Sequence, residues 1–261
     1  MKVIAICNQK GGVTKSTSTV NLGVGLVLQG KKVCLVDMDP QADLTTSLGW
    51  PDNDNLSVTL ATMMEKIISD APIDPQEGIL RHSEGVDLIP ANMELSGMEI
   101  ALVGAMSREF TLKSYLDTVK GAYDYVLIDC MPSLGMLTIN ALAAADSVIV
   151  PVQAQYLPAK GMTQLMKTIA KVKKQINPGL TIDGVLLTLV DSRTNLARAT
   201  EDILRRQYGG ILKIYKTRIP VSVKAAETSA AGQSIFAYNG GGRVAKAYMD
   251  LVMEVLADGE A

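Results

Sequence analysis

The chain of 261 residues is poor in the side chains that most often carry metal or nucleophilic chemistry. It has a single histidine, His82, and three cysteines, none of them in a Cys-x-x-Cys pair. A two-histidine metal site within one chain is therefore excluded, and neither a thiolate metal site nor a disulfide framework is indicated. This sparing use of cysteine is typical of a reducing, cytoplasmic setting.

Aromatic residues and long apolar runs are also scarce. Aromatics make up 4% of the chain while apolar residues make up 48%, so a large core has to rest on aliphatic side chains and methionine. The longest stretch without charge, residues 130–145, is too short and too polar to span a membrane. Residues 253–261 are acidic, which is the wrong charge for a helix that docks on anionic lipid. We expect no membrane association.

The net charge of −2 conceals an asymmetry along the chain. Residues 147–224 hold 13 lysines and arginines against four acidic residues, and the rest of the chain is correspondingly acidic. A basic segment of this size fits either a solvated helix surface or a face that binds a polyanion.

Strand-like and helix-like segments alternate along the whole chain. We expect strands at 2–7, 32–36, 86–89, 125–128, 147–150, 182–190 and 211–214, and helices at 16–29, 57–68, 95–119 (with a break near residue 104), 137–145, 159–176, 195–208 and 243–256. Such alternation predicts the α/β class, with a mostly parallel twisted sheet covered by helices on both faces. We expect one domain over residues 1–261, with no helix-turn-helix extension before residue 8.

The loop after the first strand has the composition of a phosphate-binding loop. Ligands of open α/β sheets bind beyond the carboxyl ends of the strands, and this loop also opens onto a helix N-terminus. Gly11 and Gly12 let the backbone turn tightly, Lys15 is placed to reach the β- and γ-phosphates, and the Ser16 hydroxyl is a candidate ligand of Mg²⁺. The usual Walker A spacing is not met, because Gln9 stands where that pattern needs its first glycine.

The pattern that does match is Lys-Gly-Gly-x-x-Lys-Ser/Thr, which spans Lys10 to Ser16 and is followed by Thr17. At this point the chain resembles the ParA/MinD family of P-loop ATPases with a deviant Walker A motif. The segments at 37–41, 129–135 and 191–195 sharpen the resemblance to the ParA (Soj-like) partitioning branch. The resemblance implies that backbone groups of residues 11–17, Val13 among them, hold ATP, and that Lys10 reaches the nucleotide of a partner in a sandwich dimer. Thr14 stands where the family usually has glycine; a positive φ there would strain the loop.

Three carboxylates follow buried strands near this loop. A carboxylate at the end of such a strand lies beside the phosphates, where it can hold Mg²⁺ directly or through water. The resemblance implies that Asp129 is the Walker B residue, that Asp37 orders the magnesium shell, and that Asp39 orients the attacking water. Taken alone, Asp39 before Pro40 also fits a plain turn. We expect slow hydrolysis that an activator accelerates.

The remaining assignments concern the base and DNA. No Asn-Lys-x-Asp motif is present, which disfavours GTP, and the resemblance implies that Asp191 and Pro220 lie against adenine. It also implies that the ATP-bound homodimer binds DNA without sequence preference and is released by a ParB-type partner, as a cytoplasmic, nucleoid-associated protein. The candidate DNA-binding residues are Arg193, Lys224, Arg198, Lys171 and Lys174.

Two other function classes fit parts of the sequence. One is a ParA-like positioning ATPase for another cargo, such as a protein cluster or a division regulator. The other is a small-molecule enzyme or an iron–sulfur carrier on the same fold. The carrier would need an accessible thiolate, for which Cys130 beside Asp129 is the candidate, since Cys7 and Cys34 lie within expected strands.

Overall fold

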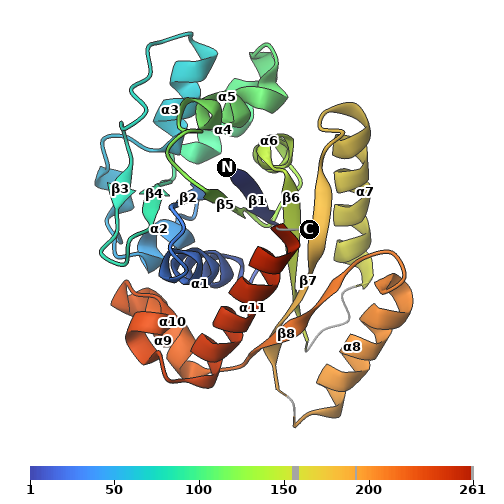
Figure 1. Ribbon diagram of the computed structural model, residues 1–261. Coiled ribbons are helices and arrows are strands. Elements are labelled where there is room, and N and C mark those ends of the chain that lie inside the picture. Colours follow the sequence, from blue (N-terminus) through green and yellow to red (C-terminus); the bar gives the residue numbers. More distant parts are fainter. Residues whose placement is uncertain (155–158, 192, 260–261) are drawn as a thin grey trace.

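A single sheet forms the centre of the molecule (Figure 1). The computed structural model describes residues 1–154, 159–191 and 193–259, and the side chains of 159 and 160 are not described. Within these residues the strand order is β3-β4-β2-β5-β1-β6-β7-β8, and every neighbouring pair is parallel except β3 with β4. The strands are β1 Lys2–Ile6, β2 Val33–Met38, β3 Leu80–Arg81, β4 Asp87–Ile89, β5 Tyr125–Cys130, β6 Ser147–Gln153, β7 Thr181–Val190 and β8 Ile214–Pro220.

Helices cover both faces of this sheet, as the alternation predicts. The central strands alternate between two cores: Val3 and Ala5 pack with one, Ile4 and Ile6 with the other. One core is closed by α3 Leu60–Ile68, α4 Leu95–Ala101, α5 Thr111–Thr118, α6 Met136–Ala144, α7 Ala159–Gln175 and α8 Asn195–Tyr208. The other is closed by α1 Lys15–Leu28, α2 Asp43–Ser47, α10 Ile235–Asn239 and α11 Arg243–Gly259, with α9 Val223–Ala231 at its margin. The expected fold class is confirmed.

The structure corrects the sequence prediction at the last strand. Residues 211–214 were expected as a strand, but Ile211 is 81% exposed and the strand begins only at Ile214. In β8 the inward residues Tyr215, Thr217 and Ile219 alternate with exposed Lys216 and Arg218. The sequence prediction ended the strand at residue 214 and so missed residues 215–220. The short helices α2, α9 and α10 and the two-residue strand β3 were also missed, because segments of two to nine residues carry little periodic signal.

Candidate functional site

The loop between β1 and α1 is held in place from several sides and leaves its helix end open. Asn8 donates to the carbonyl of Pro151 (2.6 Å) and accepts from the backbone N–H of Lys10 (3.0 Å), while Thr188 of β7 donates to the carbonyl of Val13 (3.1 Å). The residue before α1, Thr14, provides no side-chain cap. The N–H groups of the first turn, which begins at Lys15, are therefore left for a ligand.

Two residues of this loop have left-handed backbone conformations. Gly12 has φ +71° and Thr14 has φ +65°. The first is ordinary for glycine, but a β-branched residue in this region is strained. The structure thus places Thr14 in the conformation that the usual glycine of the family accepts freely.

A pocket of about 580 Å³ lies over this helix end. Its walls come from the phosphate loop, from the turn after β2 and from Pro132, which follows β5; the α9 side closes it with Ser229 and Ala230. Most of the predicted phosphate-site residues line it, namely Gly11, Gly12, Thr14, Lys15, Ser16, Thr17 and Asp39. Val13 is not among the lining residues, and its side chain is buried.

Asp37 and Asp129 face each other in register at the carboxyl ends of β2 and β5. Asp37 is fully buried, and its carboxylate accepts from the Thr45 N–H (2.8 Å), the Thr45 hydroxyl (2.7 Å) and the Asp39 N–H (3.2 Å). Burial raises its pKa to about 7 in spite of these bonds. Sequence reasoning missed Thr45, which anchors Asp37 to α2; the preceding αL residue Ala42 and the short helix gave no usable signal.

Asp129 differs from Asp37 in its hydrogen bonding. It is 1% exposed, and neither of its carboxylate oxygens has a hydrogen-bond partner among the described residues. Burial, and then the charge of Asp37, raise its pKa well above the usual range, while Ser16 and Lys15 act in the opposite direction. A buried carboxylate with free oxygens next to a serine hydroxyl suits a hard cation.

The residues present therefore fit magnesium. Within the described part of the chain no group of three or more His, Cys, Asp or Glu side chains forms a metal cage. That agrees with Mg²⁺, which is usually held by one or two carboxylates, waters and the phosphates of its nucleotide. Asp129 and Ser16 would contact it, and Asp37 lies behind them.

Lys10 lies apart from this pocket. Its side chain is exposed, and Nζ donates to Oε1 of Gln153 (3.3 Å) at the end of β6. Lys15, in contrast, is only 8% exposed and lines the pocket. The two lysines of the motif therefore point to different places, one to the pocket and one to the surface.

The predicted adenine residues are brought side by side, because Val190 of β7 pairs with Pro220 of β8 and Asp191 follows directly. The Asp191 carboxylate accepts from Nε and Nη2 of Arg193, at 2.9 Å each. These bonds lower the pKa of Asp191 to about 2. A predicted base contact and a predicted DNA contact are thus paired with each other.

The candidate DNA-binding residues are exposed but do not form one patch. Lys171 and Lys174 lie on the outer side of α7, and Arg198 lies on α8, in the same part of the molecule (Figure 1). Arg205 and Arg218 share the carboxylate of Glu201 (2.9 and 2.7 Å) beside them. Lys224 is on α9, which packs with α2 and α10 on the other side of the sheet, and its Nζ lies 5.5 Å from the ring of Tyr238.

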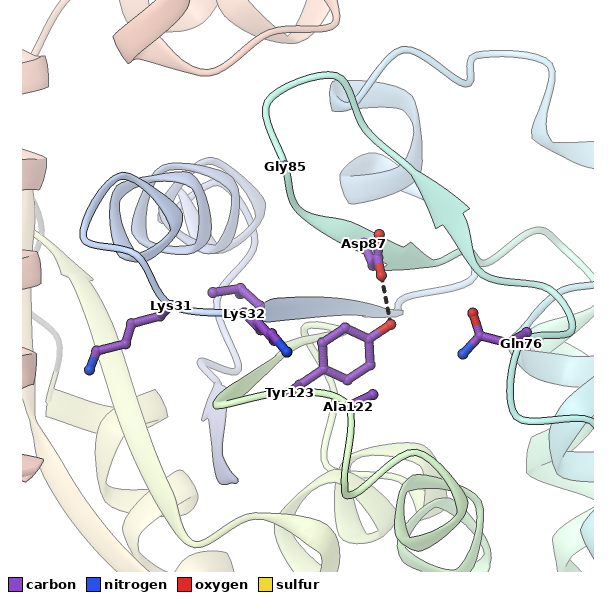
Figure 2. Close-up of a pocket in the computed structure, with 8 residues that line it drawn as sticks. Lys31, Lys32, Gln76, Gly85, Asp87, Ala122 and Tyr123 are labelled. Carbon is purple, nitrogen blue, oxygen red and sulfur yellow. Dashed lines mark hydrogen bonds between the residues drawn. The ribbon is translucent and has the colours of Figure 1, made fainter.

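A second pocket, of about 290 Å³, lies at the opposite edge of the sheet, where β2, β4 and β5 begin (Figure 2). The Tyr123 hydroxyl donates to Asp87 (2.7 Å), and Lys31 extends away from the tyrosine ring. This pocket lies at the amino-terminal ends of the strands, whereas ligands of open α/β sheets bind beyond the carboxyl-terminal ends, so it is not the candidate site.

Two further sequence expectations meet the structure here. Cys130 was expected to be accessible, but it is 1% exposed and Cys7 and Cys34 are equally buried, because all three point into the cores. That expectation is wrong, and the iron–sulfur alternative loses its candidate. In the described part of the chain, no helix is long and apolar enough to cross a membrane.

Comparisons with known proteins agree with this geometry. The family model described as an AAA domain matches residues 1–182. The sporulation initiation inhibitor protein Soj of Bacillus subtilis is 44% identical over 99% of both chains. The chromosome partitioning protein ParA of Caulobacter vibrioides is 38% identical over 98% of this chain and 94% of that protein. The chromosome-partitioning ATPase Soj of Treponema pallidum is 38% identical over 99% of both chains.

Among solved structures, one similar chain is named cobyrinic acid a,c-diamide synthase from Mycobacterium smegmatis, with bound ADP and magnesium. It is 38% identical, with a TM-score of 0.80, over 94% of this chain and 97% of that one.

Proposed function

The chain belongs to the ParA/MinD family of P-loop ATPases, in the ParA (Soj-like) branch, and from this membership we propose how its site works in DNA partitioning. ATP and Mg²⁺ are its ligands. The ATP-bound protein forms a homodimer, binds nucleoid DNA without sequence preference, and leaves the DNA when a centromere-binding, ParB-type partner stimulates hydrolysis.

One observation carries the proposal: the uncapped N-terminus of α1 opens into the pocket, and the buried, unpartnered Asp129 carboxylate lies next to Ser16 and Lys15, which line that pocket. The first supplies N–H donors and the positive end of a helix dipole to phosphate oxygens. The second supplies a buried negative charge that a cation neutralises.

The chain's own residues then divide the work of phosphoryl transfer. Lys15 pairs with the phosphates from within the pocket, and Ser16 and Asp129 hold the magnesium ion, which supplies positive charge to the phosphate oxygens. Asp39 lines the same pocket and orients the attacking water. Its Oδ1 accepts from the Gln41 N–H (3.0 Å), which fixes the carboxylate.

The exposed position of Lys10 supports a role across a dimer interface. A lysine that points out of its own pocket can reach the phosphates of a second copy, where its charge stabilises the transition state. Hydrolysis is then slow in the monomer and depends on assembly. Asp191 and Pro220 contact the adenine base. For this contact the hydrogen bonds from Arg193 to the Asp191 carboxylate have to break.

The basic residues of α7 and α8 supply the DNA contacts. Lys171, Lys174 and Arg198 neutralise backbone phosphates, together with Arg193 and Lys224. A ParA-like positioning ATPase for another cargo uses the same site and the same dimer. The identity of the partner that stimulates hydrolysis separates the two.

The deciding experiment is retention of the protein on non-specific DNA with ATP, with ADP and without nucleotide. We expect retention with ATP only, and loss of retention as salt rises. Retention that ignores the nucleotide contradicts the proposal. Turnover of ATP only in the presence of a carboxylate small-molecule acceptor would instead support a synthase of the kind named for the Mycobacterium smegmatis chain.

A further inference from the structure

The loop after Asp129 leads directly into α6, and the start of this helix has no cap of its own. Gly135 occupies the N-cap position and offers no side chain, so the first backbone N–H groups of α6 need an acceptor from elsewhere. An unsatisfied helix start at this point would leave the preceding loop free to shift.

The acceptor is Glu99, from the distant helix α4. Its Oε2 accepts from the N–H of Met136 (2.9 Å) and its Oε1 from the N–H of Leu137 (3.1 Å). A carboxylate that takes two successive N–H groups at a helix N-terminus also meets the positive end of the dipole. Glu99 is half-buried, so solvent screens this contact only in part.

Gly135 is what lets the carboxylate come so close. Its φ of −76° is one that any residue adopts, so backbone freedom does not explain the glycine. A Cβ built there would overlap Oε1 of Glu99 and lie 2.9 Å from its Cδ and Oε2. The space at this glycine is therefore the space that the carboxylate uses.

The same loop borders the nucleotide pocket. Pro132 lines the pocket, and Ser133 ties the next residues to α6, because its carbonyl accepts from the Thr138 hydroxyl (2.9 Å). The position of Pro132 is thus set at one end by β5 and at the other by the start of α6.

We propose that Glu99 is a positioning residue for ATP hydrolysis: by holding the start of α6, it fixes the loop of residues 131–135 against the nucleotide. The inference rests on the proposed ATPase function. Glu99 is not among the residues that line the pocket, so we expect its loss to change turnover and not nucleotide binding.

The test is Glu99→Gln, which keeps the shape of the side chain but can accept only one of the two N–H groups. We expect its turnover number to fall by about tenfold, with KM for ATP within about twofold of the wild type. Hydrogen exchange at the amides of Met136 and Leu137 should be faster. Gly135→Ala displaces the same carboxylate, so it should have the same effects, and the double variant should be no worse than either single one.

The matched control is Glu254→Gln on α11. Glu254 also accepts from two successive N–H groups, those of Lys216 (3.1 Å) and Thr217 (2.7 Å), but at the edge strand β8. This variant should speed exchange at residues 216–217 and leave turnover unchanged.

Unchanged exchange at 136–137 in Glu99→Gln overturns the contact, and faster exchange with normal turnover overturns the positioning role. A wild type that turns over no ATP overturns the proposed function, while the exchange experiment still tests the contact by itself.

Discussion

Thr14 is the residue at which this chain departs from the phosphate-loop pattern that it otherwise matches. Its φ of +65° costs a non-glycine residue about 1–2 kcal/mol. Its hydroxyl makes no capping bond; it lies 3.5 Å from the Ser18 hydroxyl and also interacts with the hydroxyl of Tyr248. The loop therefore carries backbone strain at the point where phosphate is expected.

Replacing Thr14 by glycine should relieve this strain. Glycine also raises the conformational entropy of the unfolded chain, which costs about 0.4–1 kcal/mol of stability, so we expect a net gain of about 0.8 kcal/mol from the midpoints of the two ranges. Thermal unfolding without nucleotide should then show a rise of about 2–4 °C. Thr17→Gly, within the first helical turn, should instead lower the melting temperature. A lower melting temperature for Thr14→Gly would show that the conformation is not strained.

The paired carboxylates make the nucleotide-free protein sensitive to pH. Asp37 has a pKa of about 7 against an ordinary 3.8, and the pKa of Asp129 is also raised. A carboxyl whose pKa is higher in the folded state binds more protons there. For Asp37 this stabilising contribution is full below pH 3.8, declines as the pH rises from there to about 7, and is absent at higher pH; Asp129 acts in the same direction.

Asp129→Asn removes one of these groups without removing a hydrogen bond. We expect the variant to melt above the wild type at pH 8, and the two melting temperatures to converge toward pH 5. Magnesium and ATP together should stabilise the wild type, since the cation takes the place of the proton, but should stabilise the variant much less. Parallel melting curves of the two proteins across this pH range would contradict the assignment.

At the scale of elements, α7 shows how one helix serves the core and the surface. Leu165, Ile169 and Val172 are buried against the sheet, while Lys171 and Lys174 are exposed on the opposite side. The apolar spacing that predicted the helix is also the reason that the lysines face outward.

Replacing both of these lysines by alanine should weaken DNA binding through charge alone. The slope of log K against log salt should become shallower by about 2, because about one counterion is released for each phosphate contact. Lys113→Ala with Lys120→Ala, on and just after α5, removes the same charge from another exposed surface and should leave the slope unchanged. Equal slopes for the two double variants would show that α7 does not contact DNA.

For the whole molecule, the separation of the two motif lysines leads us to expect that activity depends on assembly. Lys15 is buried in its own pocket and Lys10 is exposed beside Gln153. We therefore expect the chain to bind a nucleotide alone and the charge of Lys10 to act on the nucleotide of a second copy.

Lys10→Ala should bind ATP but lose the ATP-dependent dimer in size-exclusion chromatography, and its stimulated turnover should fall by at least about tenfold. Asp39→Ala should bind ATP, remain a dimer and stay on DNA, because it lacks the group that orients water. Lys32→Ala, at the opposite edge of the sheet, is the matched control. Normal hydrolysis by Asp39→Ala would contradict its assigned role.

The sequence by itself determined the parts of this protein that depend on neighbours along the chain. The alternation of apolar segments indicated the α/β class, and the run from Lys10 to Thr17 placed the phosphate loop between a strand and a helix. Asp37, Asp39 and Asp129 were singled out because they follow expected apolar strands, and the resemblance to the family supplied their roles. These features are local, and side-chain periodicity records them directly.

Only the tertiary structure decided what these groups meet. The register of β2 against β5 sets Asp37 beside Asp129, and the fold brings Thr45 to Asp37, Arg193 to Asp191 and Glu99 to the start of α6. Strand order and helix packing depend on how distant segments bury their apolar faces, and no local pattern encodes such pairings. The exposed charges of β8 are explained by its position at the edge of the sheet, and that position depends on the strand order, which the local sequence does not show.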